Sequence, residues 1–205
     1  KSVEIALVGK YVSLQDSYKS IAEAFIHAGA DLETEVKIRW VYSGDLTEDN
    51  IKETFSGIDG MLIAPGFGDR GIEGKISAAR YARENNIPLL GICLGMQIMT
   101  IEFARNVLGY KKANSMEFDT STADPVISLM EEQKNVVDKG GTMRLGAWKC
   151  TLKPNSKLLE IYGSKNISER HRHRYEFNSE YKEEFEKNGL LPTGLNPETG
   201  LVETL

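Results

Sequence analysis

Cysteines, long apolar runs and an excess of positive charge are all scarce or lacking in this sequence, and each lack excludes a class of protein. Two cysteines among 205 residues cannot build a disulfide framework, and they lack the CxxC spacing typical of metal sites. No apolar run approaches the roughly 20 residues that span a bilayer. The stretch KSVEIALVGKYV at residues 1–12 is typical of a strand rather than a signal peptide. We therefore expect a cytoplasmic protein, and a single reactive thiol is compatible with this composition.

The charges show no concentration of one sign. The chain has 25 basic and 30 acidic side chains, a formal net charge of −5, spread fairly evenly. Nucleic acids and anionic membranes attract basic patches, so we expect neither as a partner and predict a small soluble substrate.

A length of 205 residues suits one domain that buries about 70% of its unfolded surface. Because residue 1 is Lys rather than Met, we interpret the chain as trimmed or as a domain cut from a longer protein.

The first half of the chain alternates short apolar, β-branched runs with segments of helical periodicity. Ser17 is a candidate N-cap and Gly29 a candidate stop for the first helix. Strands that alternate with crossover helices predict a mostly parallel sheet covered on both faces, a three-layer α/β/α arrangement with its functional edge where strands end and helices begin. Strands are expected at residues 3–9, 35–43, 60–66 and 87–93, and helices at 17–32, 47–57, 75–86 and 94–109.

The second half is less regular. Strands are expected at 141–152, 167–178 and from 200 onward, and short helices at 156–163 and 179–189. We find no repeat, linker or low-complexity segment. The sequence thus predicts one domain over residues 1–205, of α/β class with an extra β-rich portion.

Cys93 lies where a buried strand is expected to meet a helix. Gly91 and Gly95 flank it in a G-x-C-x-G pattern, the arrangement of the nucleophile elbow in hydrolases. Such a turn holds the nucleophile in a strained, exposed conformation, and the positive end of the following helix favours the thiolate. The N–H of Leu94 is then a candidate oxyanion donor. The alternative is an inert buried cysteine, which is how we interpret Cys150.

A second glycine loop, APGFGDRGIEG at residues 64–74, also follows an expected strand and precedes an expected helix. Its backbone can approach a substrate closely, and the N–H of Gly66 is a candidate for the second oxyanion donor. The loop lacks the GxGxxG and GK[ST] patterns of phosphate-binding loops. A plain flexible loop is the alternative.

A catalytic thiolate needs a base, usually a histidine held by a carboxylate. His27 falls within the first expected helix and is interpreted as structural or exposed. His171 and His173 lie two residues apart in ERHRHRYEFN, so they share one face of a strand, with arginines on the other face. On local grounds either of the pair is the candidate base.

The motif GICLGMQ at residues 91–97 resembles the nucleophile motif of class I, triad-type glutamine amidotransferases. Within that family the chain resembles the glutaminase domains of CTP synthases specifically, on the segments LVGKYVSLQDSYKSIAEAFIHAG, GFGDRGIEGKI, LGICLGMQ, GGTMRLGA and ERHRHRYEFN. The resemblance covers nearly the whole chain and implies the flavodoxin-like fold of the family.

The resemblance also implies a mechanism. Cys93 would attack the carboxamide of glutamine, release ammonia and form a glutamyl thioester that water hydrolyses. Gly66 and Leu94 would form the oxyanion hole, and Phe67 and Arg70 would belong to an effector loop. The glutamine site would be lined by Gly66, Leu94, Gly95, Met96, Gln97, Glu117 and Arg174, with no metal or cofactor in this domain.

In the full enzyme, the resemblance implies a synthase domain on the same polypeptide that uses ATP and Mg²⁺ to aminate UTP to CTP. It further implies GTP as allosteric activator and a homotetramer.

Two departures from the family matter. The family's PGGFG is here APGFG, with Pro65 in place of the first Gly, which stiffens the loop. The catalytic His and Glu of the family belong to an HPE motif expected beyond Leu205, so the resemblance overrides the local choice of His171 or His173, and no residue shown is assigned as base.

Two other functions stay open at this stage. A cysteine hydrolase of the same architecture would also carry the elbow, and a non-catalytic assembly or sensing module could retain the thiol without using it. Protection of Cys93 by glutamine separates the amidotransferase from both.

Overall fold

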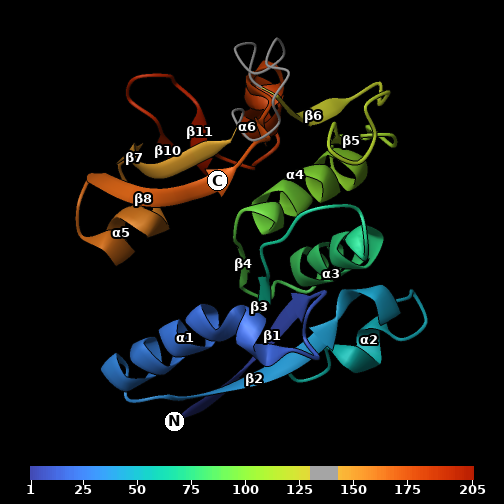
Figure 1. Ribbon diagram of the computed structural model, residues 1–205, viewed down its shortest axis with the longest axis vertical. Coiled ribbons are helices and arrows are strands. Elements are labelled where there is room, and N and C mark those ends of the chain that lie inside the picture. Colours follow the sequence, from blue (N-terminus) through green and yellow to red (C-terminus); the bar gives the residue numbers. More distant parts are fainter. Residues whose placement is uncertain (130–142) are drawn as a thin grey trace. The chain divides into compact units, whose positions relative to one another are not determined.

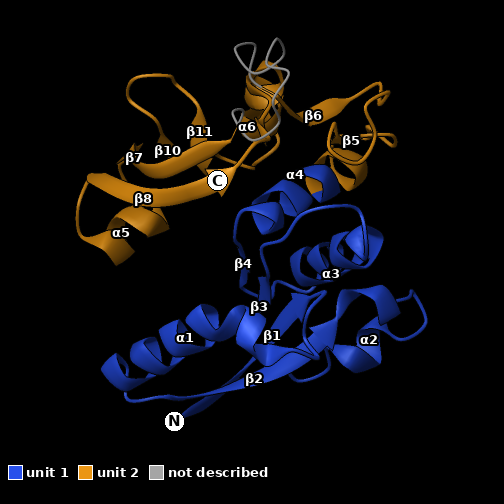
Figure 2. Cartoon of the chain, viewed as in Figure 1, with its two compact units in different colours: residues 1–102 blue, residues 103–205 orange. Residues whose placement is uncertain are grey.

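The computed structural model describes residues 1–129 and 143–205, and the start of the predicted strand at 141–152 lies outside them. The described chain forms two compact units, residues 1–102 and 103–205, shown in different colours in Figure 2. The expectation of one domain over residues 1–205 stays a prediction.

Unit 1 is built on a four-stranded parallel sheet with strand order β2-β1-β3-β4 (Figure 1). β1 pairs with β2 over eight residues, from Ser2 opposite Glu35 to Gly9 opposite Tyr42. The strands are β1 (Ser2–Gly9), β2 (Glu35–Tyr42), β3 (Gly60–Ile63) and β4 (Leu89–Gly91). The helices are η1 (Gln15–Tyr18), α1 (Lys19–Asp31), η2 (Ser43–Asp45), α2 (Ile51–Thr54), α3 (Ile72–Glu84) and α4 (Leu94–Asn106), which begins in unit 1.

Both faces of this sheet are covered, as predicted. Alternate residues of a strand point to opposite faces, and β1 shows this directly. Ala6 and Val8 pack in a core with Ile51 of α2, Phe55 directly after it, and Ala78 and Ala82 of α3. Leu7 packs in a separate core with Tyr18, and Ile21 and Phe25 of α1 lie against it. β1, β3 and β4 are parallel, with Val8 opposite Ile63 and Ile63 opposite Gly91, so the loops that follow these strands start from one edge of the sheet.

Three local predictions in unit 1 were wrong. Ser17 does not cap α1, because it lies inside the short helix η1 and α1 begins at Lys19. Gly29 does not end α1, which continues to Asp31. A Cβ at Gly29 would lie 2.5 Å from the Thr34 carbonyl oxygen, so this glycine allows the loop to β2 to pass close by. The helix expected at 47–57 is reduced to the single turn of α2.

The described residues of unit 2 form two sheets. The larger has strand order β11-β10-β7-β8 and is antiparallel, and its longest pairing joins β7 to β8 from Arg144–His173 to Thr151–Asn166. The smaller has the order β5-β6-β9. The strands are β5 (Asn114–Ser115), β6 (Pro125–Ser128), β7 (Arg144–Leu152), β8 (Asn166–His173), β9 (Glu176–Phe177), β10 (Gly194–Leu195) and β11 (Val202–Thr204). The helices are α5 (Lys157–Tyr162), η5 (Ser179–Tyr181) and α6 (Lys182–Lys187).

The extra β-rich portion is thus present, and α5 has the predicted ends. Ser156 Oγ accepts the N–H of Leu159 at 3.2 Å, and Gly163 closes the helix at a φ of 63°. The strand expected at 167–178 is interrupted, so that β8 and β9 belong to different sheets. Within residues 1–129 and 143–205, no helix combines the length and the apolarity needed to cross a membrane.

Candidate active site

Cys93 occupies a strained turn between β4 and α4. Its φ of 55° lies in the left-handed region, which non-glycine residues seldom adopt. The turn is held by two backbone hydrogen bonds: the N–H of Ile92 donates to the Ile63 carbonyl at 3.2 Å, and the N–H of Gly95 donates to the Ile92 carbonyl at 2.9 Å. Cys93 is half-buried. The backbone thus has the elbow geometry expected from G-x-C-x-G.

The glycines on either side of Cys93 are required by contact with backbone. A Cβ at Gly95 would lie 2.3 Å from the Ile63 carbonyl oxygen, and one at Gly91 would lie 2.5 Å from the Gly95 carbonyl carbon. Both distances are shorter than a van der Waals contact, and the obstructing atoms are main chain, which cannot rotate away. The pattern therefore reflects the approach of α4 to the end of β3.

Leu94 opens α4, so its N–H is among those that have no carbonyl partner within the helix. These N–H groups and the aligned peptide dipoles make the helix start favourable for a negative charge. Gln97 lies one turn on, is buried, and donates its N–H to the Cys93 carbonyl at 3.3 Å. Gly95 and Met96 complete this first turn.

The 64–68 loop lies against the elbow. A Cβ placed on Gly66 would be 3.5 Å from Cδ2 of Leu94, so the two predicted oxyanion donors belong to neighbouring segments. Phe67, in the predicted effector loop, is 51% exposed, and the Arg70 guanidinium lies 5.4 Å from the ring centroid of Tyr11. The structure therefore groups Gly66, Leu94 and Cys93 within unit 1.

Two buried lysines also touch this loop. Lys75, on α3, donates from Nζ to the Ala64 carbonyl at 3.0 Å. Lys10, just after β1, donates from Nζ to the Phe67 carbonyl. Burial, and to a smaller extent the charge of Lys10, lowers the pKa of Lys75 to about 8, while Cys93 acts in the opposite direction. The candidate nucleophile therefore has a positive charge nearby in an interior setting.

The other predicted substrate residues, Glu117 and Arg174, are in unit 2. Glu117 follows β5, is half-buried and donates its N–H to Ser115 Oγ at 3.1 Å. Arg174 follows β8 and is also half-buried. Both residues belong to unit 2, whereas Cys93 belongs to unit 1. Their grouping with Cys93 in one site therefore stays a prediction.

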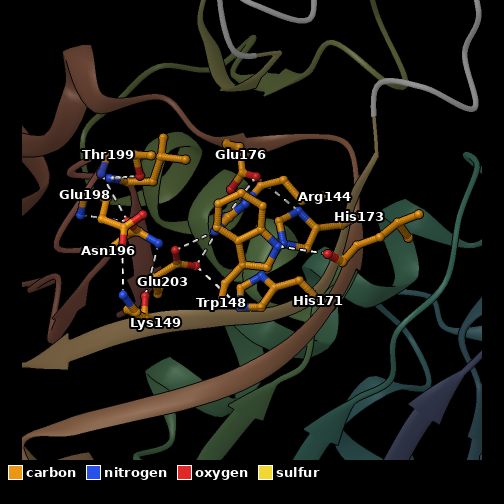
Figure 3. Close-up of polar contacts among 12 residues, drawn as sticks. Arg144, Trp148, Lys149, His171, His173, Glu176, Asn196, Glu198, Thr199 and Glu203 are labelled. Carbon is orange, nitrogen blue, oxygen red and sulfur yellow. Dashed lines mark hydrogen bonds and ion pairs between the residues drawn. The ribbon is translucent and has the colours of Figure 1, made fainter.

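His171 and His173 belong to an ionic cluster in unit 2 (Figure 3). Arg144 is at its centre, with Nη2 2.7 Å from Glu203 Oε1 and Nη1 3.1 Å from Glu176 Oε1. His171 Nε2 lies 3.6 Å from Glu203 Oε2, and His173 Nδ1 lies 3.3 Å from Glu176 Oε1. The prediction that His171 and His173 share one face of a strand is therefore confirmed, and both side chains contact this cluster.

Burial dominates the titration of this cluster. It raises the pKa of Glu176 to about 7, against the opposing effect of Arg144. Burial, together with repulsion from Arg144 and from the protonated form of His171, lowers the pKa of His173 to about 4. Burial also lowers the pKa of His171. Both imidazoles are therefore neutral at neutral pH.

The comparison with protein families settles the class of the domain. The family model described as "Glutamine amidotransferase class-I" matches residues 13–204, nearly the whole chain. The chain belongs to the class I glutamine amidotransferase family.

Relatives of this amidotransferase point to one branch of the family. It is 62% identical over 203 residues to a CTP synthase of Flavobacterium johnsoniae, covering 99% of this chain and 38% of the relative. It is 64% identical over 201 residues to a CTP synthase of Cytophaga hutchinsonii, covering 98% of this chain and 37% of that protein. The chain thus spans less than two fifths of these relatives.

A solved structure gives the same result for the fold. The glutaminase domain of Trypanosoma brucei CTPS, solved with bound acivicin, is 38% identical and has a TM-score of 0.89, over 98% of this chain and 78% of that one. The amidotransferase therefore has the class I fold in the form found in CTP synthase glutaminase domains.

Sequence analysis missed several charged residues of this amidotransferase that the structure buries, among them the cations Lys10, Lys75 and Arg144. Lysine and arginine are usually exposed, so composition argues against burial. A signal for Lys75 was present, since it lies one turn from Ile72 and Ala79 on the apolar side of α3. Arg144 offered no local signal, because its partners Glu176 and Glu203 are 32 and 59 residues away.

Proposed function

We propose that this domain hydrolyses glutamine to glutamate and ammonia with Cys93 as the nucleophile. The observation that carries the proposal is the elbow: a cysteine at a φ of 55°, at the start of a helix, with a glycine loop against the same turn. This arrangement holds a thiolate at the edge of the sheet and puts backbone N–H groups beside it.

In the proposed reaction, the Cys93 sulfur attacks the carboxamide carbon of glutamine. The negative charge that develops on the carbonyl oxygen is stabilised by the N–H groups of Gly66 and Leu94. The C–N bond breaks, ammonia leaves with a proton, and a glutamyl thioester forms. Water then cleaves the thioester, which releases glutamate and restores the thiol.

The remaining residues have binding roles in this proposal. Gln97 and Glu117 hold the amino acid end of glutamine, and Glu117 is the partner of its ammonium group. Arg174 contributes a charged neighbour, while Gly95 and Met96 line the same site. The proton shuttle is assigned, by the resemblance, to the His and Glu of an HPE segment and to no residue between 1 and 205.

The whole-enzyme role is part of the same proposal. The 62% identity to a CTP synthase supports delivery of ammonia to a synthase domain, where ATP and Mg²⁺ serve the amination of UTP to CTP in the cytoplasm. The proposal also includes GTP as an activator that acts near Phe67 and Arg70, and assembly into a homotetramer. The resemblance to the family is the only support for these two points. Among residues 1–129 and 143–205, no group of three or more His, Cys, Asp or Glu side chains is placed to hold a metal ion. No residue of this chain is assigned to ATP or Mg²⁺.

The test is labelling with a diazo-ketone analogue of glutamine, read by intact mass and peptide mapping, with and without excess glutamine. We expect one adduct, on Cys93, suppressed by glutamine and absent in Cys93→Ser. Cys150 is the matched internal control. Burial, with smaller contributions from the negative charges of Glu203 and Glu169, raises the pKa of its thiol to about 11. Cys150 should stay unlabelled. Labelling of Cys93 that glutamine does not slow would favour a cysteine hydrolase, and no labelling would favour a non-catalytic module.

A further inference from the structure

Lys75 is the most deeply buried charged side chain near the candidate nucleophile. It lies in the first turn of α3 and is 0% exposed. An isolated ammonium is costly to bury, because the interior solvates charge far less well than water. The hydrogen bond from Nζ to the Ala64 carbonyl satisfies one of its three donors. An apolar residue at position 75 would avoid the free-energy cost of burying an ammonium group, so packing alone does not account for a lysine here.

The contacts of Lys75 and Lys10 bracket Gly66. Lys75 holds the Ala64 carbonyl on one side of the glycine, and Lys10 holds the Phe67 carbonyl on the other. The aliphatic part of Lys10 also passes close to Gly66, since a Cβ there would be 3.3 Å from Lys10 Cε. With the carbonyls on both sides fixed, the peptide that carries the Gly66 N–H has little freedom to rotate.

Lys75 also interacts electrostatically with Cys93, and this interaction is mutual. A negative thiolate favours the protonated form of the lysine, and by the same energy the ammonium favours the thiolate. Among the described residues, the titratable groups whose charges act on Lys75 are Lys10, from the end of β1, and Cys93, from the turn between β4 and α4. η2 packs against α3 at Gly74, the residue before Lys75, and the residue of η2 at this contact is the uncharged Ser43.

We propose that Lys75 is a positioning residue of the glutaminase site, whose buried ammonium holds the oxyanion loop through the Ala64 carbonyl and stabilises the Cys93 thiolate. This inference rests on the proposed function in one respect, the assignment of Cys93 as nucleophile. Lys10 has the supporting role of holding the far side of the loop. With a pKa of about 8, Lys75 keeps its charge at neutral pH and loses it in mildly alkaline solution.

The experiment measures the rate of Cys93 alkylation by iodoacetamide against pH, by peptide mapping of the 205-residue chain. The variants are Lys75→Met, which removes the charge with little change of volume, and Lys75→Arg, which keeps it. Lys52→Met, at an exposed lysine of α2, is the matched control. For Lys75→Met we expect the midpoint of the rate profile to move to higher pH by about one unit, with about a tenfold slower reaction near neutral pH and an unchanged plateau. Lys75→Arg and Lys52→Met should leave the midpoint unchanged.

A midpoint that stays in place for Lys75→Met would overturn the proposal, whatever happens to stability. Should that variant fail to fold, Lys75→Gln keeps a donor for the Ala64 carbonyl while removing the charge, and the same shift is expected of it. Iodoacetamide needs no glutamine site. The outcome is therefore independent of glutamine protection, so failure of the proposed function and failure of this inference are distinguishable.

Discussion

Arg144 and Trp148 lie on β7 with the guanidinium carbon 4.3 Å from the centre of the indole ring. The ring covers the arginine while Glu176 and Glu203 bind its nitrogens. Side chains of three strands, β7, β9 and β11, therefore meet at one buried cation. Figure 3 shows the indole and the two carboxylates around it.

We predict that Arg144→Met strongly destabilises the fold. The arginine is 2% exposed, and its loss leaves the carboxylates of Glu176 and Glu203 buried without their cation. Removing one member of a buried ion pair costs about 3–5 kcal/mol in free energy of unfolding. Urea unfolding followed by tryptophan fluorescence measures the change.

The control for that prediction is Lys149→Met on the same strand. Lys149 and its partner Glu198 are 73% and 66% exposed, so solvent screens their attraction and the urea midpoint should barely change. Equal midpoints for the two variants would contradict the importance of the buried cluster.

The second prediction concerns pH and the opposing pKa shifts of His173 and Glu176. The pKa of His173 is depressed to about 4, so the unfolded chain binds an extra proton between about pH 6.5 and 4 and stability falls as pH falls. The pKa of Glu176 is raised to about 7, so the folded chain holds an extra proton between about pH 4.5 and 7 and stability falls as pH rises. Where the windows overlap, the two effects cancel.

Single variants should expose each effect. Relative to the wild type, His173→Gln should gain stability as pH falls from about 6.5 to 4, while Glu176→Gln should gain it as pH rises from about 4.5 to 7. The slope for one proton is about 1.4 kcal/mol per pH unit. Urea midpoints across this range provide the test, and differences of the same sign for both variants would refute the assignment of the shifts.

The third prediction is that Gly95→Ala disrupts the elbow. The added methyl would lie 2.3 Å from the Ile63 carbonyl oxygen, so α4 or the end of β3 must move. We expect loss of glutamine-protectable labelling of Cys93 and a marked loss of stability. Gly57→Ala is the matched control: Gly57 has a φ of 76° with nothing within 4 Å, so only backbone strain of about 1–2 kcal/mol is expected there. Normal labelling in Gly95→Ala would show that the turn tolerates a side chain.

Prediction from sequence succeeded where the cause of a feature is local. The G-x-C-x-G turn at Cys93, the short helix expected at 156–163 and the strand expected at 3–9 each depend on neighbours in the chain, and each is present. The parallel sheet followed from the regular alternation of strands and helices.

Prediction failed where the cause is distant. Gly29 was taken for a helix stop, but it is needed because the Thr34 carbonyl passes 2.5 Å from where its Cβ would lie. The two-residue strands β5 and β10 were missed, because a segment that short has no periodicity to detect. Arg144 was overlooked because its environment is assembled from residues far along the chain.

The spacing of residues in the larger sheet of unit 2 also orders its assembly in time. Thr151 and Asn166 are 15 residues apart and can pair after a short loop closes, whereas Arg144 and Glu203 are 59 residues apart. Closing the longer loop costs more chain entropy and raises the contact order. The β7–β8 ribbon can therefore form before β11 arrives with Glu203. Until then Arg144 lacks one of its anions, so we expect the ionic cluster to be completed late in the assembly of this sheet.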